Sequence, residues 1–481
     1  MKRLFTAALA AAMMYSAAAA IAEEKYTAAP EIYRITIRSE ERVNGVPKGD
    51  PPRRESTYRT YVRKEYLVTA NPDIDRAVAK MVDLLDEQLS PALREANEVS
   101  AQYAGRLDIE TVYTVSGHTV SVLVLARETF RRQQLRSPFL SGVYDLDTGK
   151  EIALTDMFPA GSPAWEGLAH GVREQLGAMF PEEPRNPGTV DRLAGEAASG
   201  TANFTLSGAE LTLHYPAEEI FPGKANILHV RFYYPQFAGM WTEAGKKAAD
   251  NSRWKLIAMT FDDGPGYTGI RGYGSGWVLP QFRAAGWRVT YFILGRNILS
   301  NPDVLMAQAD NNHSMQNHSM YHPHGKEMIS KSVVDRQVNM VDDHMQKAIG
   351  VRTALFRAPF GEINPWCKRG INMPVIQWSV SAKYGSAPAK SIVRTLSEKG
   401  TLHDGAILMF HDTRVGMAEA VPQIAALLRD NGYLAVTVDE LAAAYGIALE
   451  PGKVYYRLTP EGETGKRAGP ESSGESDDDA A

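Results

Sequence analysis

The stretch Thr260-Phe261-Asp262-Asp263-Gly264-Pro265 marks a point where an apolar run ends in two adjacent carboxylates. Residues 256–261 are typical of a buried strand, and the Gly-Pro pair breaks it. Folds built on a βα barrel place their active sites at the carboxyl ends of strands. Adjacent carboxylates repel each other, so burying both requires a cation or a proton. Alone, the motif fits equally well an ordinary strand-to-turn junction, where Asp-Gly is common.

From residue 255 onward, short apolar runs alternate with amphipathic segments. We expect strands at 256–261, 289–294, 353–356, 375–378, 407–410 and 434–436. We expect helices at 332–349 and 417–428. This alternation predicts parallel strands in an α/β fold, either a (β/α) barrel or a doubly wound sheet.

Histidines gather in the same half of the chain, with seven of the 11 between His313 and His411. His318 and His322 are four residues apart, a spacing that brings both imidazoles to one face if the segment is helical. With one carboxylate they form a His₂Asp set, which suits Zn²⁺ with an open position for water. The alternative is a chance surface pair. We expect His313 and His324 to support the site or lie on the surface.

Two further segments end in polar residues. In Phe356-Arg357-Ala358-Pro359-Phe360-Gly361, the arginine fork is expected to hold one Asp carboxylate in a bidentate pair. The alternative is a surface arginine before a tight turn. The backbone path set by the proline and glycine can aim main-chain N–H groups at an oxyanion. The run at 408–410 ends in His411, a candidate general acid because histidine titrates near neutrality.

Taken together, these motifs resemble the polysaccharide deacetylase (NodB-homology) family, carbohydrate esterase family four. Their order and separations match over about Lys255 to Tyr445, and Val289 to Gly295 is similar to the family's second core strand. The resemblance implies a distorted (β/α) barrel that hydrolyses N- or O-acetyl groups on sugars. It also implies a polysaccharide substrate and one divalent metal ion, Zn²⁺ ahead of Co²⁺, Ni²⁺ or Mn²⁺.

The resemblance assigns a role to each matching residue. These roles are catalytic base for Asp262, metal ligand for Asp263, His318 and His322, orientation of the base for Arg357, oxyanion donor for the backbone N–H of Phe360, general acid for His411, and substrate contact for Pro359 and Trp378. In the expected mechanism the metal acidifies a water, Asp262 takes its proton and His411 protonates the departing amine.

One segment departs from the family pattern. An Asp-x-x-Asp-Trp motif usually follows the position of Trp378, but this chain has Ser381-Ala382-Lys383-Tyr384-Gly385 there. A histidine without a carboxylate partner is less well oriented. The alternative hypothesis is therefore a catalytically weak or inactive, metal-containing glycan-binding protein of the cell envelope.

The preceding part of the chain, residues 26–245, predicts an α+β accessory domain ahead of a deacetylase domain at 253–446. Its expected strands are 33–38, 58–68, 107–115, 120–126 and 211–215, with helices at 71–89 and near 165–179. Residues 142–158 and 204–222 resemble an extracytoplasmic domain found before some peptidoglycan deacetylases, which makes peptidoglycan the first expected substrate. A third hypothesis is an envelope scaffold whose N-terminal block binds a partner.

The ends of the chain and its composition set outer limits. Residues 1–22 predict a cleaved signal peptide, and so an exported protein, periplasmic or secreted; a retained anchor is the alternative. The acidic residues 460–481 are expected to be disordered. A net charge of −5 argues against nucleic-acid binding, and no later segment is apolar enough for an integral membrane protein. The single cysteine, Cys367, excludes internal disulfides and is expected to be a buried thiol. The oligomeric state is left open.

Overall fold

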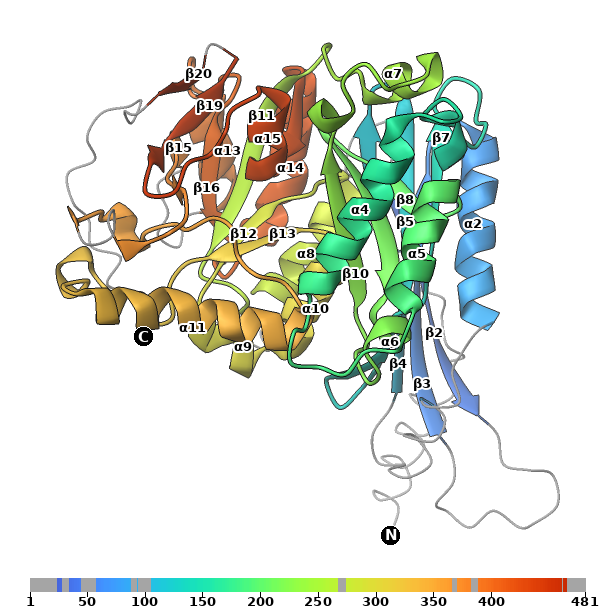
Figure 1. Ribbon diagram of the computed structural model, residues 1–481, viewed down its shortest axis with the longest axis horizontal. Helices are drawn as coiled ribbons and strands as arrows, with labels where there is room; N and C mark the ends of the chain where they lie inside the picture. The colour runs from blue at the N-terminus through green and yellow to red at the C-terminus, as the bar shows by residue number, and fades with distance from the viewer. Residues whose placement is uncertain are drawn as a thin grey trace, which may run out of the picture.

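A computed structural model describes residues 24–27, 34–44, 58–87, 93, 105–266, 274–365, 370–381, 388–460 and 462–464 (Figure 1). The predicted signal peptide, Cys367 and Tyr384 lie outside these ranges. Among the described residues, no helix combines the length and the apolar character needed to cross a bilayer.

The N-terminal part of the chain forms a seven-stranded sheet. Its strands are β1 (Glu24–Thr27), β2 (Arg34–Asn44), β3 (Tyr58–Val68), β4 (Gly105–Ser116), β5 (Thr119–Phe130), β6 (Gln133–Arg136) and β7 (Phe139–Asp145), in the order β1-β2-β3-β4-β5-β6 with β7 also on β5. Helix α2 (Pro72–Glu87) covers one face with Ile74, Val78, Val82 and Leu85. Strand β5 is buried along most of its length, which explains its continuous apolar run.

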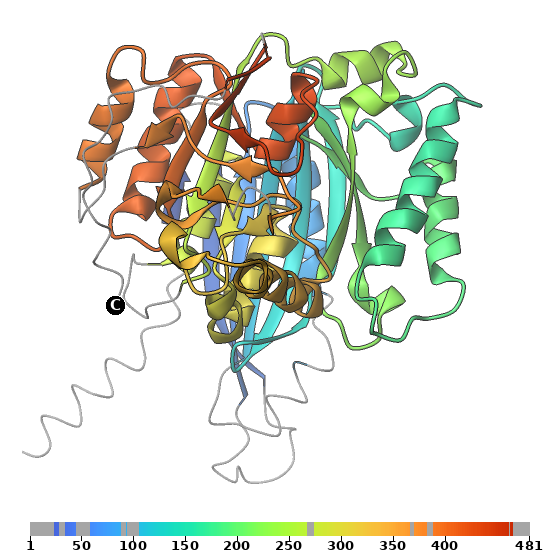
Figure 2. The same cartoon turned by 60° about the vertical axis from the view of Figure 1, so that its left-hand side comes forward.

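A second layer packs beside this sheet (Figure 2). It contains α4 (Pro163–Ala178), α5 (Thr189–Ser199), α6 (Ala217–Ile220), α7 (Glu243–Ala249), and a three-stranded sheet in the order β10 (Ile227–Tyr233), β9 (Glu210–Pro216), β8 (Phe204–Leu206). Helix α4 begins as its sequence predicts, because Ser162 caps it and Pro163 occupies its first turn. The expected strands and helices of this half of the chain are therefore present.

The C-terminal part is an α/β fold, as expected. A parallel sheet has the order β13 (Ser314–Asn317), β12 (Thr290–Ile293), β11 (Lys255–Asp262), β16 (Ile407–His411), β15 (Val380–Ser381), with β17 (Tyr433–Val436) on β11. The surrounding helices are α8 (Ser275–Ala285), α9 (Gly295–Ser300), α10 (Pro302–Asp310), α11 (Lys331–Ile349), α13 (Ala389–Ser397), α14 (Met417–Asp430) and α15 (Val438–Ala444). A parallel sheet covered by helices follows from the βα alternation.

Several expectations for this part need correction. The expected strand at 353–356 is only an isolated bridge at Phe356, which links Asn317 to Val375. Beyond it, β14 (Val375–Ile376) pairs with β18 (Val454–Tyr455) and not with β15, so a closed barrel is not seen in the described part of the chain. Disorder does not begin at residue 460, because β20 (Gly462–Thr464) pairs with β19 (Arg457–Thr459). Such pairing is made by backbone groups and needs no apolar side chains.

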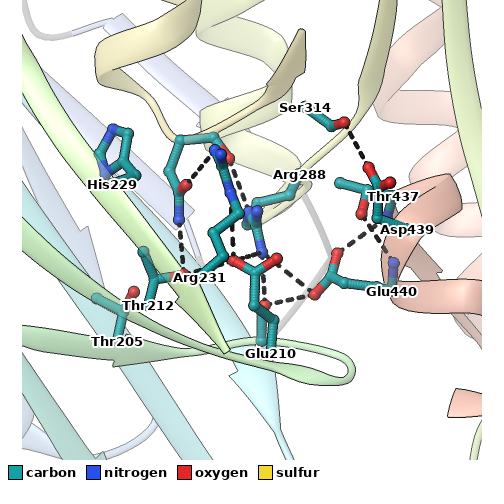
Figure 3. A network of polar contacts seen from close by, with 12 residues as sticks. Thr205, Glu210, Thr212, His229, Arg231, Arg288, Ser314, Thr437, Asp439 and Glu440 are labelled. Carbon is teal, nitrogen blue, oxygen red and sulfur yellow. Dashed lines mark hydrogen bonds and ion pairs between the residues drawn. The ribbon is translucent and has the colours of Figure 1, made fainter. Parts of the chain in front are cut away.

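A buried polar network joins the second layer to the C-terminal sheet (Figure 3). Arg288 precedes β12 and lies 3.0 Å from Glu210 of β9 and 3.2 Å from Glu440 of α15. All three side chains are 3 % exposed or less. Arg231 of β10 donates to Asn312 over 2.8 Å, and Ser314 of β13 donates to Asp439 over 2.7 Å. Segments far apart in sequence are therefore held together by charge.

Candidate active site

Strand β11 delivers two carboxylates to the carboxyl edge of the parallel sheet. Asp262 is the last strand residue, is 3 % exposed, and lies in register with His411 at the end of β16. Asp263 follows with a left-handed backbone (φ 71°), and its carbonyl accepts a 2.8 Å hydrogen bond from Asn297. This backbone reversal separates the two carboxylates, so that each faces a different set of neighbours.

Asp263 faces three imidazoles. Its Oδ1 lies 3.5 Å from Nε2 of His318 and 3.5 Å from Nε2 of His322, and its Oδ2 lies 3.6 Å from Nε2 of His411. One ligand atom from each of Asp263, His318 and His322 lies within 4.8 Å of the other two. Oδ1 of Asp263 is buried and accepts no hydrogen bond within the described ranges. A divalent cation fits this donor set, because it would satisfy the buried oxygen and take two imidazoles.

The histidine pair converges by a route that its spacing did not predict. Residues 318–322 are a loop after β13, not a helix, and Ser319 and His322 both have positive φ values, 73° and 57°. The N–H of His322 donates to Oγ of Ser319 over 3.0 Å. Nδ1 of His318 lies 3.0 Å from the carbonyl of Arg357, which leaves Nε2 to face Asp263.

Arg357 forms a buried, hydrogen-bonded ion pair with Asp262. Its side chain is 0 % exposed, and Nη1 donates to Asp262 Oδ1 and to Oγ1 of Thr260, each over 2.7 Å. Nε donates to the carbonyl of Ile376 and Nη2 to that of Gln377. The expected bidentate fork is therefore wrong, because the other guanidinium nitrogens bind backbone carbonyls. The surface-arginine alternative is excluded by the burial.

A small pocket opens over these residues, with a cavity volume of about 70 Å³. The residues that line it are Asp262, Asp263, His318, His322, Ala358, Phe360, Trp378, Met409, His411 and Arg414. Pro359, expected to contact substrate, is buried and is not among them. Phe360 has a left-handed backbone (φ 56°) and its ring lies edge-on to His322 and stacks on His324.

Part of this chain is similar to known proteins. Residues 249–371 match the family model described as polysaccharide deacetylase. The chain carries a polysaccharide deacetylase domain. It is 31 % identical over 329 residues to the peptidoglycan-N-acetylglucosamine deacetylase PgdA of Listeria monocytogenes, an alignment that covers 66 % of each chain. The chain thus spans just under two thirds of the length of this relative.

One further relative is similar over a shorter region and has a solved structure. The peptidoglycan-N-acetylmuramic acid deacetylase PdaC of Bacillus subtilis is 31 % identical over 189 residues, which covers 39 % of this chain and 38 % of that protein. The solved structure of PdaC from Bacillus subtilis is 29 % identical, covers 40 % of this chain and 92 % of that one, and superimposes with a TM-score of 0.37. The enzyme class expected from the sequence, polysaccharide deacetylase, is the class to which these relatives are named as belonging.

The electrostatics of the deacetylase domain favour ligands in their metal-binding forms. Burial opposes ionisation of Asp263, but attraction to His411, His318 and His322 in their protonated forms outweighs it and lowers the pKa of that carboxyl. Burial lowers the pKa of His322 to about 4, helped by the neighbouring His318. A carboxylate and a neutral imidazole are the forms that bind metal.

Two residues at or beside this pocket were not predicted from sequence. Arg414 lines the pocket, and Asp412, beside His411, is 0 % exposed. Burial raises the pKa of Asp412 to about 7. The His-Asp pair at the end of an apolar run was the available signal for Asp412. Ser381, at the position where the family resemblance implies an acid, lies on β15 in register with Met409.

Proposed function

We propose that this protein is a metal-dependent hydrolase that removes acetyl groups from the N-acetylated sugars of a peptidoglycan-type polysaccharide outside the cytoplasm. One observation carries the proposal: Asp263, His318 and His322 converge beside the Asp262–Arg357 pair in one pocket. Relatives named as peptidoglycan deacetylases support the substrate class.

Each residue of the pocket has a task in this proposal. A divalent cation held by Asp263, His318 and His322 would polarise the acetyl carbonyl and acidify water. Asp262, oriented by Arg357, accepts the proton of the attacking water. His411 gives a proton to the departing amine nitrogen, and acetate leaves. The backbone N–H of Phe360 donates to the carbonyl oxygen as it gains charge.

The donor set fits Zn²⁺ best, with Co²⁺, Ni²⁺ or Mn²⁺ as alternatives. We also propose that residues 1–22 direct export, that residues 26–245 form an accessory domain, and that residues 253–446 form the deacetylase domain. Cell fractionation of the full chain with and without residues 1–22 tests export. Retention of the chain in the cytoplasm with residues 1–22 present would contradict that part.

A weak or inactive glycan-binding protein is the second candidate function. Ser381 favours it, because it is a serine on β15 at a position where the family resemblance implies a carboxylate. It predicts bound metal and bound glycan with no acetate release.

The test is acetate release from N-acetylglucosamine oligomers and from peptidoglycan by the metal-loaded full chain. Asp262→Asn should reduce release by at least about 100-fold without reducing metal content, since it removes the base and leaves the ligands. Asp335→Asn is the matched control, because among the described residues Asp335 pairs only with Lys331, on the solvent-facing side of α11. Equal release by Asp262→Asn and wild type would refute the base. No release by the wild type, with metal bound, would favour the second candidate.

A further inference from the structure

A second, larger cleft lies between the seven-stranded sheet and the deacetylase domain. Its volume is about 690 Å³, within the range of sites that hold small ligands. Strands β2 to β5 form one wall, and helices α8 and α10 form the other. Helix α8 packs directly against β2 and β4.

The cleft is rich in arginine. Among the described residues that line it, the guanidinium groups belong to Arg63, Arg106, Arg127, Arg131, Arg132 and Arg283. Against these six stand three lining carboxylates, Asp108, Glu110 and Asp303, with Glu65 paired to Arg283 from behind. Even with Glu65 included, positive groups outnumber negative ones among the lining residues that the structure describes. Arginine recognises carboxylate through paired N–H donors, so the excess favours an anionic ligand.

Buried acids hold several of these arginines in place, and two of the arginines, Arg106 and Arg132, are more than half exposed. Asp108 and Glu110 are 4 % and 2 % exposed and pair with Arg106 and Arg127. The side chain of Arg106 is nevertheless 57 % exposed. Because carboxylates at the base of the cleft already hold these side chains, a ligand would bind them at a smaller cost in conformational entropy.

The tip of the cleft is an unusual hairpin turn. Phe130 pairs with Gln133, so Arg131 and Arg132 are the two turn residues, and both have positive φ values, 50° and 66°. Such turns favour Asn-Gly, because non-glycine residues are strained there. Arg132 crosses the cleft to Asp303 of α10 through two hydrogen bonds of 2.8 and 3.0 Å. Two arginines therefore occupy positions where backbone geometry favours other residues.

The cleft also offers an apolar surface and a link to the deacetylase pocket. Trp277 in the first turn of α8 lines it and is 38 % exposed, and an indole face suits the apolar face of a sugar ring. Ser275, at the start of the same helix, accepts a 2.8 Å hydrogen bond from Gly266 N–H, three residues after Asp263. The helix that forms one wall of the cleft is thus hydrogen-bonded to the segment that carries Asp263.

We propose that this cleft binds a carboxylate-bearing part of a glycan strand, with Trp277 against a sugar ring and the arginines against the carboxylates. The inference rests on the proposed action on a polysaccharide and specifies which part of that polymer the second site holds. The carboxylates come either from the sugar rings or from peptide substituents, and the chemistry of recognition is the same. The cleft would hold an acidic part of the glycan strand while a neighbouring part of the same strand lies at Asp263, His318 and His322.

The experiment measures equilibrium binding to the wild-type full chain by isothermal titration. The probes are trigalacturonate, with ring carboxylates and no acetyl group, its neutral counterpart cellotriose, and a disaccharide-peptide fragment of peptidoglycan with free peptide carboxylates. We expect at least one acidic probe to bind at least about tenfold more tightly than cellotriose, and to weaken as salt rises. Binding of only one acidic probe identifies the source of the carboxylates.

Variants separate recognition from folding. Arg131→Asn combined with Arg132→Gly should weaken the acidic probe about tenfold while thermal stability is kept or raised, because Asn-Gly suits the turn. Trp277→Ala should also weaken it. Arg173→Gln is the matched control, since Arg173 is 51 % exposed and pairs with Asp191 as Arg132, 52 % exposed, pairs with Asp303.

Three outcomes would overturn the proposal: equal affinity for cellotriose and both acidic probes, unchanged affinity in the turn and Trp277 variants, or tighter binding of a single-stranded oligonucleotide. Acetate release from a neutral N-acetylglucosamine oligomer is measured separately and does not depend on the acidic probes. Acetate release without binding of the acidic probes would reject only the proposed role of the cleft. Binding of the acidic probes without acetate release would reject only the proposed hydrolase activity.

Discussion

Two clusters of charged residues in this protein gather side chains from distant parts of the chain, but they differ in how their charges are satisfied. In the network of Figure 3, Arg288 contacts both Glu210 and Glu440, and Asp439 accepts from Ser314. In the deacetylase pocket, Asp262 has Arg357, but the nearest basic atoms to Asp263 are imidazole nitrogens at 3.5–3.6 Å. Arg288, Glu210 and Glu440 each have an oppositely charged partner, although Nη2 of Arg288 and Oε2 of Glu210 make no hydrogen bond among the described residues. Oδ1 of Asp263 is buried, accepts no hydrogen bond from the described residues and faces imidazoles only.

This difference separates a structural cluster from a chemical one. Buried charges without partners cost several kcal/mol, so a protein keeps them only where a ligand completes the set. The network lies among packed segments, whereas Asp263 borders a pocket of about 70 Å³. Substitutions in the pocket should therefore change metal content and turnover. Substitutions in the network should change the free energy of unfolding.

The largest effect is expected at the unmatched carboxylate. Asp263→Ala should abolish stoichiometric metal binding and reduce acetate release by at least about 1,000-fold, because a metal ligand is lost. Elemental analysis of the purified chain and an acetate assay measure both. His324→Ala, adjacent to the cluster but outside the ligand set, should keep its metal. Full metal content in Asp263→Ala would show that the two clusters do not differ in this way.

The next effect is expected in the network. Arg288→Met leaves Glu210 and Glu440 buried without their shared cation, which should lower the free energy of unfolding by about 3–5 kcal/mol. Denaturant unfolding measures it, and metal content per folded molecule should not change. Arg173→Met, which removes an exposed pair, should cost less than about 1 kcal/mol. Similar losses in both variants would mean that the buried network contributes little.

A third change tests whether Arg357 acts through Asp262. Arg357→Lys keeps a positive charge but cannot reproduce the planar set of bonds to Asp262, Thr260 and two backbone carbonyls. We expect kcat to fall about 100-fold with metal content unchanged, because the base is misaligned. Arg173→Lys should leave kcat unchanged. Loss of metal together with kcat would instead indicate that Arg357 mainly holds His318 through its carbonyl.

Much of the pocket was predictable because its residues stand at the ends of apolar runs. Strands β11 and β16 are continuous apolar segments, and their last residues are Asp262 and His411. Strand β13, Ser-Met-Gln-Asn, was missed because no apolar run marks it. The loop that brings His318 and His322 together depends on positive φ values, which residue type does not reveal.

The network was not predictable for a different reason. Arg288, Glu210 and Glu440 lie 78 or more residues apart, and each alone resembles an ordinary surface charge. Only the packing of β9 against the start of β12 and against α15 buries them together. A catalytic cluster recurs as a motif, whereas a structural ion pair depends on contacts between segments that carry no shared pattern.

The smallest expected effect is on the pH dependence of the unfolding free energy, and we expect it to arise near the network and not at the pocket. His214 of β9 lies behind the network, hydrogen-bonded to Thr205 and 2.8 Å from His229, and burial with the charges of Arg288 and Arg231 lowers its pKa to about 3. Because this pKa is depressed below the unfolded value of about 6.5, its contribution to stability is present above pH 6.5 and is lost as pH falls toward 3. At pH 5 the loss should be about 2 kcal/mol.

Replacing His214 with Gln should therefore flatten the decline in unfolding free energy between pH 7 and pH 4, measured by denaturant titration at each pH. His170→Gln, on the exposed side of α4, should leave the decline as in the wild type. An unchanged slope in His214→Gln would mean that acid acts elsewhere, with the metal ligands as the next group to examine. A flattened slope would place the acid sensitivity of the fold in the second layer, apart from the pocket that carries the chemistry.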